Sequence, residues 1–372
     1  MSQAPRGLLG RIAAGAVSFT VLTYVTAIGL ALGLVTYGQF ATKLAGIKVH
    51  FFTGVFFIYP IITPIPVDLL LLTDACIIIY VACFIAAFKS RDGFLTGLQR
   101  LRQVGRVSTK SNWLVTMPLV SCALLLTVLV VTIALTQSGI SSGTLCNPCP
   151  PEAELYAALT YSPISEEIAF RVTTLGLLVF IMTLWKARSI DQGSPKPRIP
   201  SLIIASFLSP ESAKYRVGLR TITSNGLHGI HWSEWILLFL TSSLFGIAHI
   251  ISGGTDWGVG KAFTAAISGF ALGFVFLSYG AYAAILLHWF FDFYFETFNV
   301  GADAFGGALA ILPDLISLAS IIVGIVSIMV ALAWLIRRIT RDEIPTTYKT
   351  PESVTDSLVR SLHHRQVRKN RI

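Results

Sequence analysis

The chain has 372 residues, of which 54% are hydrophobic and 13% are charged, against about 25% charged residues in a typical soluble domain. So few charges cannot cover the surface of a soluble protein of this length, which excludes that class. The net charge of +9 comes without an aromatic-rich basic module. We therefore interpret it as membrane topology and attraction to the lipid bilayer, with no nucleic acid as partner.

Apolar runs recur through the whole sequence, each close to the roughly 20 residues that cross a bilayer as a helix. They predict an all-α, polytopic transmembrane helical bundle of about eight spans. The predicted spans are residues 12–40, 67–88, 114–137, 155–185, 233–251, 262–278, 281–298 and 315–336. Prolines interrupt the apolar stretch 51–66, so we expect it to be the bent upper part of the second span, with a re-entrant piece as the alternative.

Lys and Arg are concentrated in the loops 89–110 and 186–232 and in the tail after residue 337, whereas segments 138–154 and 299–314 contain neither. Excess Lys and Arg stays on the cytoplasmic side of a membrane. The pattern predicts an integral, multi-pass protein with both termini in the cytoplasm. The predicted organisation is N-terminal spans in 1–150, a membrane core in 151–300, a C-terminal span in 301–336 and a basic tail in 337–372.

Two of the five cysteines, Cys146 and Cys149, lie in the predicted external loop with two residues between them. A lone pair of this kind supplies only half of a four-cysteine zinc site, and a second pair is missing from the sequence. We expect a local disulfide or two ordinary cysteines.

A charged cluster stands inside the predicted span 155–185, where Glu166, Glu167 and Arg171 follow one another. Each such group costs about 2.5 kcal/mol or more at the bilayer centre, so charged groups there normally mark a functional site. Glu167 and Arg171 are one helical turn apart, in the favourable order for an ion pair. Glu166 lies about 100° around the helix and is left for catalysis or a metal. A purely architectural ion-pair cluster is the alternative.

Two further polar clusters lie in separate predicted spans. His249 is in the span 233–251, and His288 and Asp292 are four residues apart in the span 281–298. A carboxylate one turn from a histidine can fix the orientation and tautomer of the ring. A single intramembrane histidine is more often a hydrogen-bonded packing residue than a ligand, but two of them with carboxylates on other spans favour a functional site.

The order and type of these residues resemble the three signature motifs of the CPBP intramembrane proteases. The motifs are Glu166-Glu167-x-x-x-Arg171, Phe245-x-x-x-His249 and His288-x-x-x-Asp292, and the similarity covers roughly residues 155–300. This family includes the type II CAAX prenyl endopeptidase and the bacteriocin-processing and immunity proteins. The resemblance implies a membrane-embedded endopeptidase that hydrolyses a membrane-associated, lipid-modified or CAAX-like protein or peptide substrate.

The resemblance implies Glu166, His249, His288 and Asp292 as catalytic residues, with Glu167 and Arg171 in support. Two mechanisms stay open. In one, Glu166 and His249 activate water without a metal, and His288 and Asp292 stabilise the oxyanion. In the other, Glu166, His249 and His288 bind Zn²⁺, which lowers the pKa of its water.

Other classes of function would use the same buried groups. A proton- or metal-coupled transporter would place Glu, His and Asp in the membrane, but its internal repeats are missing from the sequence. A non-catalytic membrane scaffold would have little reason to keep every motif residue, and a transferase lacks sequence support. The protease interpretation requires His249, which lies near the external end of its predicted span, to reach Glu166 near mid-membrane, a depth difference of roughly 10 Å.

Overall fold

The computed structural model describes residues 4–50, 52–55, 59–62, 65–105, 107, 110–189, 197–251 and 256–342. The predicted all-α membrane bundle is confirmed, because long apolar helices make up most of these residues. The chain divides into two compact units, Met1–Ser327 and Ile328–Ile372. The basic tail after residue 342 and most of the proline-rich segment 189–200 lie outside the described residues.

Seven helical runs among the described residues are long and apolar enough to cross a membrane. They are formed by α1 (Ala4–Thr36), α3 (Leu69–Lys89), α5 (Trp113–Gln137), α6 (Glu152–Glu167) with η1 (Ile168–Val172) and α7 (Thr174–Arg188), α11 (Trp232–Ile251), α12 (Val259–Tyr279), and η4 (Gly307–Ile311) with α15 (Leu312–Asp342). Side chains cap two of these helices, because Asp68 accepts from the backbone of Leu70 and Asn112 from that of Leu114.

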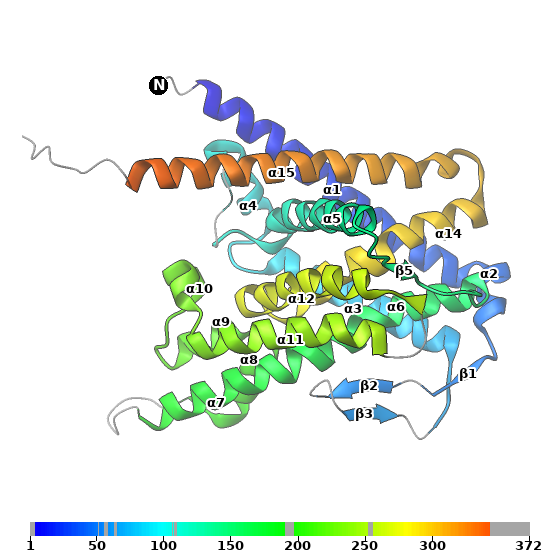
Figure 1. The fold of residues 1–372 in the computed structure, drawn as a ribbon, viewed down its shortest axis with the longest axis horizontal. Helices are drawn as coiled ribbons and strands as arrows, with labels where there is room; N and C mark the ends of the chain where they lie inside the picture. The colour runs from blue at the N-terminus through cyan, green and yellow to red at the C-terminus, as the bar shows by residue number, and fades with distance from the viewer. Residues whose placement is uncertain are drawn as a thin grey trace, which may run out of the picture. The chain divides into compact units, whose positions relative to one another are not determined.

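The predicted span 281–298 is helical but is not among those seven runs. It consists of α13 (Ala281–Trp289), η3 (Phe290–Tyr294) and α14 (Phe295–Phe305), which follow one another without a break. The polar side chains of His288, Asp292 and Glu296 lower the hydropathy of this segment, which accounts for the difference from the eight spans predicted. Its ends lie close to α12 and η4, so it carries the chain from one end of the bundle to the other (Figure 1).

Shorter helices lie at the ends of the bundle. They are α2 (Gly38–Leu44), α4 (Phe94–Val104), α8 (Ile199–Leu208), α9 (Pro210–Arg216), α10 (Ile222–Asn225) and the 3₁₀ turn η2 (Gly226–Gly229). Among them, α8 is strongly apolar. Strands β1 (Lys48–Val49) and β4 (Val67–Asp68) pair with each other, as do β5 (Gly143–Thr144) and β6 (Asp256–Trp257). Close to β5, Cys146 and Cys149 form a disulfide.

The stretch 51–66 was wrongly predicted as the start of the second span. Its described residues form an antiparallel hairpin of β2 (Phe52–Val55) and β3 (Tyr59–Ile62), in which Gly54 is opposite Pro60. The hairpin lies against η1, and a Cβ on Gly54 would stand 2.8 Å from the Cβ of Ala169. Because real Cβ atoms do not approach so closely, glycine is required for this contact. The re-entrant alternative stays a prediction.

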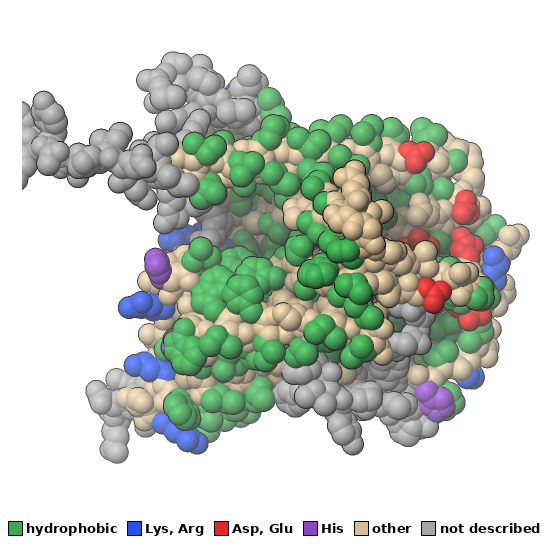
Figure 2. All heavy atoms as spheres, in the orientation of Figure 1, with side chains coloured by type: hydrophobic (Ala, Val, Ile, Leu, Met, Phe, Trp, Pro, Cys, Tyr) green, Lys and Arg blue, Asp and Glu red, His purple; other side chains and the backbone are tan. Residues whose placement is uncertain are grey.

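Basic and acidic side chains are concentrated at opposite ends of the first unit. Figure 2 shows Lys and Arg side chains near α10 and the end of α7, and Asp and Glu side chains at the opposite end. The helix ends agree with this view, because the last turn of α7 carries Lys186 and Arg188, whereas the first turn of α6 carries Glu152 and Glu154. The charge asymmetry predicted from the loops is thus present in three dimensions.

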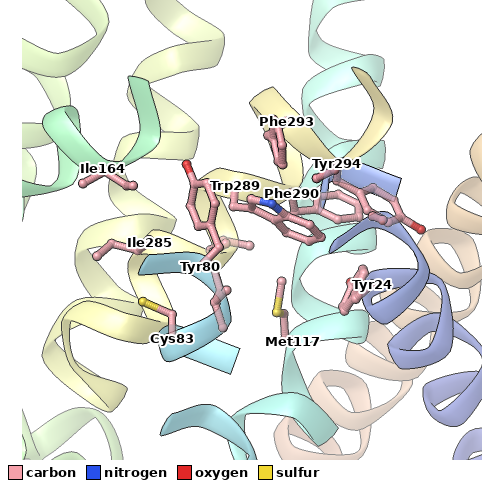
Figure 3. Close-up of a cluster of buried hydrophobic side chains, with 14 of the residues drawn as sticks. Tyr24, Tyr80, Cys83, Met117, Ile164, Ile285, Trp289, Phe290, Phe293 and Tyr294 are labelled. Atoms are coloured by element: carbon pink, nitrogen blue, oxygen red, sulfur yellow. The ribbon is translucent and has the colours of Figure 1, made fainter. Parts of the chain in front are cut away.

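A buried aromatic cluster joins the N-terminal helices to η3 (Figure 3). The ring of Trp289 makes edge contacts with Tyr24 of α1 and Phe84 of α3, at centroid distances of 5.7 and 5.2 Å. Tyr80 of α3 stacks on Phe293 at 5.7 Å and donates a 2.6 Å hydrogen bond to the carbonyl oxygen of Thr160 in α6. The first spans therefore support the two helices that carry the first and third motifs.

Candidate active site

The first motif lies where an α-helix changes into a wider π-helical turn. Helix α6 ends at Glu167 and continues as η1, and Pro163 is inside α6 rather than at its start. The third motif has the same construction, because His288 lies at the end of α13, just before the π-helical turn η3. Such turns inside α-helices are frequent at functional sites, and here both contact the site.

Glu167 and Arg171 form the ion pair predicted from their spacing. Their side chains are 0% and 1% exposed, and Nη1 of Arg171 donates to Oε1 of Glu167 at 2.9 Å. Nη2 donates to the carbonyl oxygen of Gly269 in α12, and the guanidinium lies over the ring of Phe245. The pair therefore ties η1 to α11 and α12.

Glu166 points to the side of the helix that faces the histidines. Its Oε1 accepts a 2.6 Å hydrogen bond from the hydroxyl of Ser162. Its Oε2 lies 3.7 Å from Nε2 of His288 and is buried without a hydrogen-bond partner among the described residues. One carboxylate oxygen is thus held in place while the other faces the imidazole.

His288 lies between three carboxylates. Its Nδ1 is 2.9 Å from Oε1 of Glu167, and its Nε2 is 3.4 Å from Oδ2 of Asp292. Both ring nitrogens can donate only when the ring is doubly protonated. His288 therefore lies between the two neighbouring glutamates. Its Nδ1 contacts Glu167 of the buried ion pair, and its Nε2 faces the more exposed Glu166.

His249 reaches the same site from α11. Its Nδ1 is 2.8 Å from the carbonyl oxygen of Phe245, and because a carbonyl only accepts, Nδ1 carries the proton and Nε2 is an acceptor in the neutral ring. The ring of Phe245 contacts the rings of both His249 and His288. Because Nε2 of His288 lies 3.7 Å from Oε2 of Glu166 and Phe245 contacts both histidine rings, the predicted difference in depth does not separate His249 from the other site residues.

Residues 153–294 match the family model described as type II CAAX prenyl endopeptidase Rce1-like. This segment is an Rce1-like domain. The resemblance to the CPBP intramembrane proteases is thereby confirmed, and the chain carries the domain of a membrane protease family. Comparisons with curated proteins and with solved structures each found no significant match. The Rce1-like domain contains every predicted site residue.

Sequence reasoning missed two polar residues of the Rce1-like domain. Ser162, one helical turn before Glu166, donates a hydrogen bond to its carboxylate. Lys261, in the first turn of α12, lies over the ring of Trp257 and interacts electrostatically with Asp292 and His249. The spacing of Ser162 to Glu166 was a usable signal, whereas a lone Lys at the start of an apolar run gives none.

In this structure Glu166, His249 and His288 are not arranged as a three-ligand zinc site. A metal ligand must present a lone pair, but both nitrogens of His288 face carboxylate oxygens. Among the described residues, no group of three His, Cys, Asp or Glu side chains is arranged to hold a metal ion. The set Glu166, His249 and His288 therefore stays a prediction, and the chemistry proposed for this site uses the protein's own groups.

Proposed function

We propose that the protein is an intramembrane endopeptidase in which Glu166 activates the water that cleaves a peptide bond. The observation that carries this proposal is the convergence of Glu166, His249 and His288 inside the Rce1-like domain. A membrane protease needs a general base and a partner for water in a place where water is scarce. The free Oε2 of Glu166 and the acceptor Nε2 of His249 supply these two groups.

In the proposed reaction, His249 accepts a hydrogen bond from water and Glu166 removes the other proton. The hydroxide oxygen forms a bond to the carbonyl carbon, which gives a tetrahedral oxyanion. The C–N bond then breaks, and protonated Glu166 returns its proton to the leaving amine, so that the carboxylate is regenerated. The hydrogen bond from Ser162 to Oε1 supports this role, because it directs Oε2 toward the water.

The oxyanion would be stabilised by donors on the side of His288. The Nε2 of His288 faces Glu166 and Asp292, and the positive charge of Lys261 acts on the same region. Donors fixed before the reaction stabilise developing charge without reorganising. Glu167 and Arg171 would position His288 and η1 and would not touch the substrate.

The proposed substrate is a protein or peptide held at the membrane by a lipid attached near its C-terminus. The family name supports a CAAX-type prenylated substrate, and an apolar membrane surrounding suits the lipid. We further propose that the basic end of the bundle and both termini face the cytoplasm, since Lys and Arg gather there (Figure 2).

We expect the purified protein in lipid vesicles to cleave an internally quenched peptide with a prenylated cysteine near its C-terminus. The same peptide without the prenyl group should be cleaved far more slowly, because it lacks the membrane anchor that brings it to the site. Fluorescence release and mass spectrometry of the product would measure this. Equal cleavage of both peptides would contradict the substrate proposal but not the protease proposal.

Chelators should leave the rate of this cleavage unchanged, because the proposed base and water ligand belong to the protein. The measurement is the initial rate after incubation with phenanthroline, with a non-chelating isomer as the control. Loss of activity that returns on addition of Zn²⁺ would restore the zinc mechanism with Glu166, His249 and His288 as ligands.

Asp292→Asn should retain activity, whereas Asp292→Ala should lower it. The Asn side chain keeps an oxygen that can accept from His288 Nε2, and its amide can donate to an oxyanion. The measurement is kcat for both variants beside the wild type. A loss of about 10–100-fold in the Asp292→Asn variant, the range for lost support of a metal ligand, would favour the metal mechanism if it came with chelator sensitivity. The same loss without chelator sensitivity would mean that the third motif has another role.

A further inference from the structure

A cavity of about 480 Å³ lies at the basic end of the bundle, away from the catalytic motifs. It is formed by α9, η2, the beginning of α11 and Met182 of α7, and α10 stands beside it at that end of Figure 1. None of the residues assigned to the Rce1-like active site lines it.

A buried ion pair holds the wall of this cavity in shape. Nζ of Lys214 in α9 donates to both carboxylate oxygens of Glu234 in α11, at 3.1 and 2.9 Å, and to the carbonyl oxygen of Gly229 at 2.6 Å. The carboxylate also accepts from the backbone N–H of His231 at 2.7 Å. Lys214 and Glu234 neutralise each other, so neither charge is available to bind a ligand.

Other basic groups line the cavity without an acidic counterpart. They are Arg220, His228 and His231, whose side chains are exposed. No Asp or Glu side chain is among the described residues that line it. The guanidinium of Arg220 gives this space a net positive charge and the imidazole nitrogens add hydrogen-bonding groups, which together suit a phosphate group.

The cavity opens beside an apolar face of α11. Trp232 lines the cavity and is 67% exposed, and Ile236, Phe239 and Leu240 continue its side of the helix as exposed residues. Tryptophan at the end of a membrane span normally marks the level of the lipid headgroups. Basic donors thus stand at headgroup level, directly above a surface suited to acyl chains.

We propose that this cavity binds the phosphate of an anionic phospholipid, with Arg220 as its main contact and the acyl chains along α11. The size of the cavity, its uncompensated basic groups and the adjoining apolar helix face each support a lipid rather than a free ion. This site is independent of the proposed protease activity.

The test compares Arg220→Gln with Arg216→Gln in the full-length protein purified in detergent. Arg216 is exposed at the same end, in α9, but does not line the cavity, so both variants lose the same charge. Melting temperature would be followed against short-chain phosphatidylglycerol, short-chain phosphatidylcholine and inorganic phosphate, since a ligand that binds only the folded state raises it.

We expect phosphatidylglycerol to stabilise the wild type and Arg216→Gln alike, and to be needed at roughly ten-fold or higher concentration for Arg220→Gln, the loss typical of one charged hydrogen bond. Phosphatidylcholine and inorganic phosphate should act weakly. Equal responses of the two variants, or equal protection by inorganic phosphate, would overturn the proposal. Should Arg220→Gln melt low without lipid, His228→Gln removes another group that lines the cavity, and a phosphatidylglycerol response equal to that of the wild type would then overturn the proposal.

Discussion

Glu166→Gln should abolish peptide hydrolysis while the protein stays folded in the membrane. The amide keeps an oxygen that can accept the hydrogen bond from Ser162 but cannot take a proton from water. General bases contribute typically about 10²–10⁴-fold to the rate, so a loss of this size is expected in kcat. The measurement is cleavage of the prenylated peptide in vesicles, together with the melting temperature of the purified variant.

The matched control is Glu152→Gln, which makes the same chemical change on the same helix at an exposed position. It should cleave like the wild type. A Glu166→Gln protein that melts normally and keeps full activity would show that Glu166 is not the base. It would leave the scaffold interpretation as the better one.

Glu167→Gln should reduce stability as well as activity. The substitution leaves Arg171 buried without its counter-ion and takes a carboxylate from Nδ1 of His288. Removing one partner of a fully buried ion pair costs about 3–5 kcal/mol. We therefore expect a low yield and a clearly lower melting temperature than for Glu166→Gln, because the carboxylate of Glu166 is 29% exposed and that of Glu167 is fully buried.

Combining Glu167→Gln with Arg171→Met should recover part of the lost stability, since the unpaired charge is then gone. Activity should stay low, because His288 still lacks its charged partner at Nδ1. Equal melting temperatures for wild type, Glu166→Gln and Glu167→Gln, with activity kept in Glu166→Gln, would reverse the roles assigned to the two glutamates.

The membrane-spanning helices and the place of the candidate site could be predicted from sequence because the bilayer imposes simple rules. Apolar length identified the helices, and the cost of charge in hydrocarbon singled out Glu166, Glu167 and Arg171. Helical spacing then predicted which glutamate pairs with Arg171. These rules did not predict the hairpin at 52–62, because its apolar composition is that of a membrane span. Its position also depends on the contact of Gly54 with Ala169, which is distant in the sequence.

The detailed geometry of the site was beyond prediction for a related reason. The two π-helical turns depart from the 3.6 residues per turn that spacing arguments assume throughout. The contact of Glu167 with His288 joins residues 121 positions apart, and Lys261 acts on Asp292 from a third helix. Local periodicity carries no information about such contacts.

The aromatic cluster around Trp289 crosses the N-terminal boundary of the family match. The Rce1-like segment begins at residue 153, yet the hydroxyl of Tyr80 is bonded to the backbone of Thr160 and the ring of Tyr24 lies against Trp289. In lipid, helices associate through packing and hydrogen bonds and not through exclusion of water. A fragment cut at residue 153 would lose those contacts, so we expect the helices before it to be needed for the stability of the Rce1-like segment.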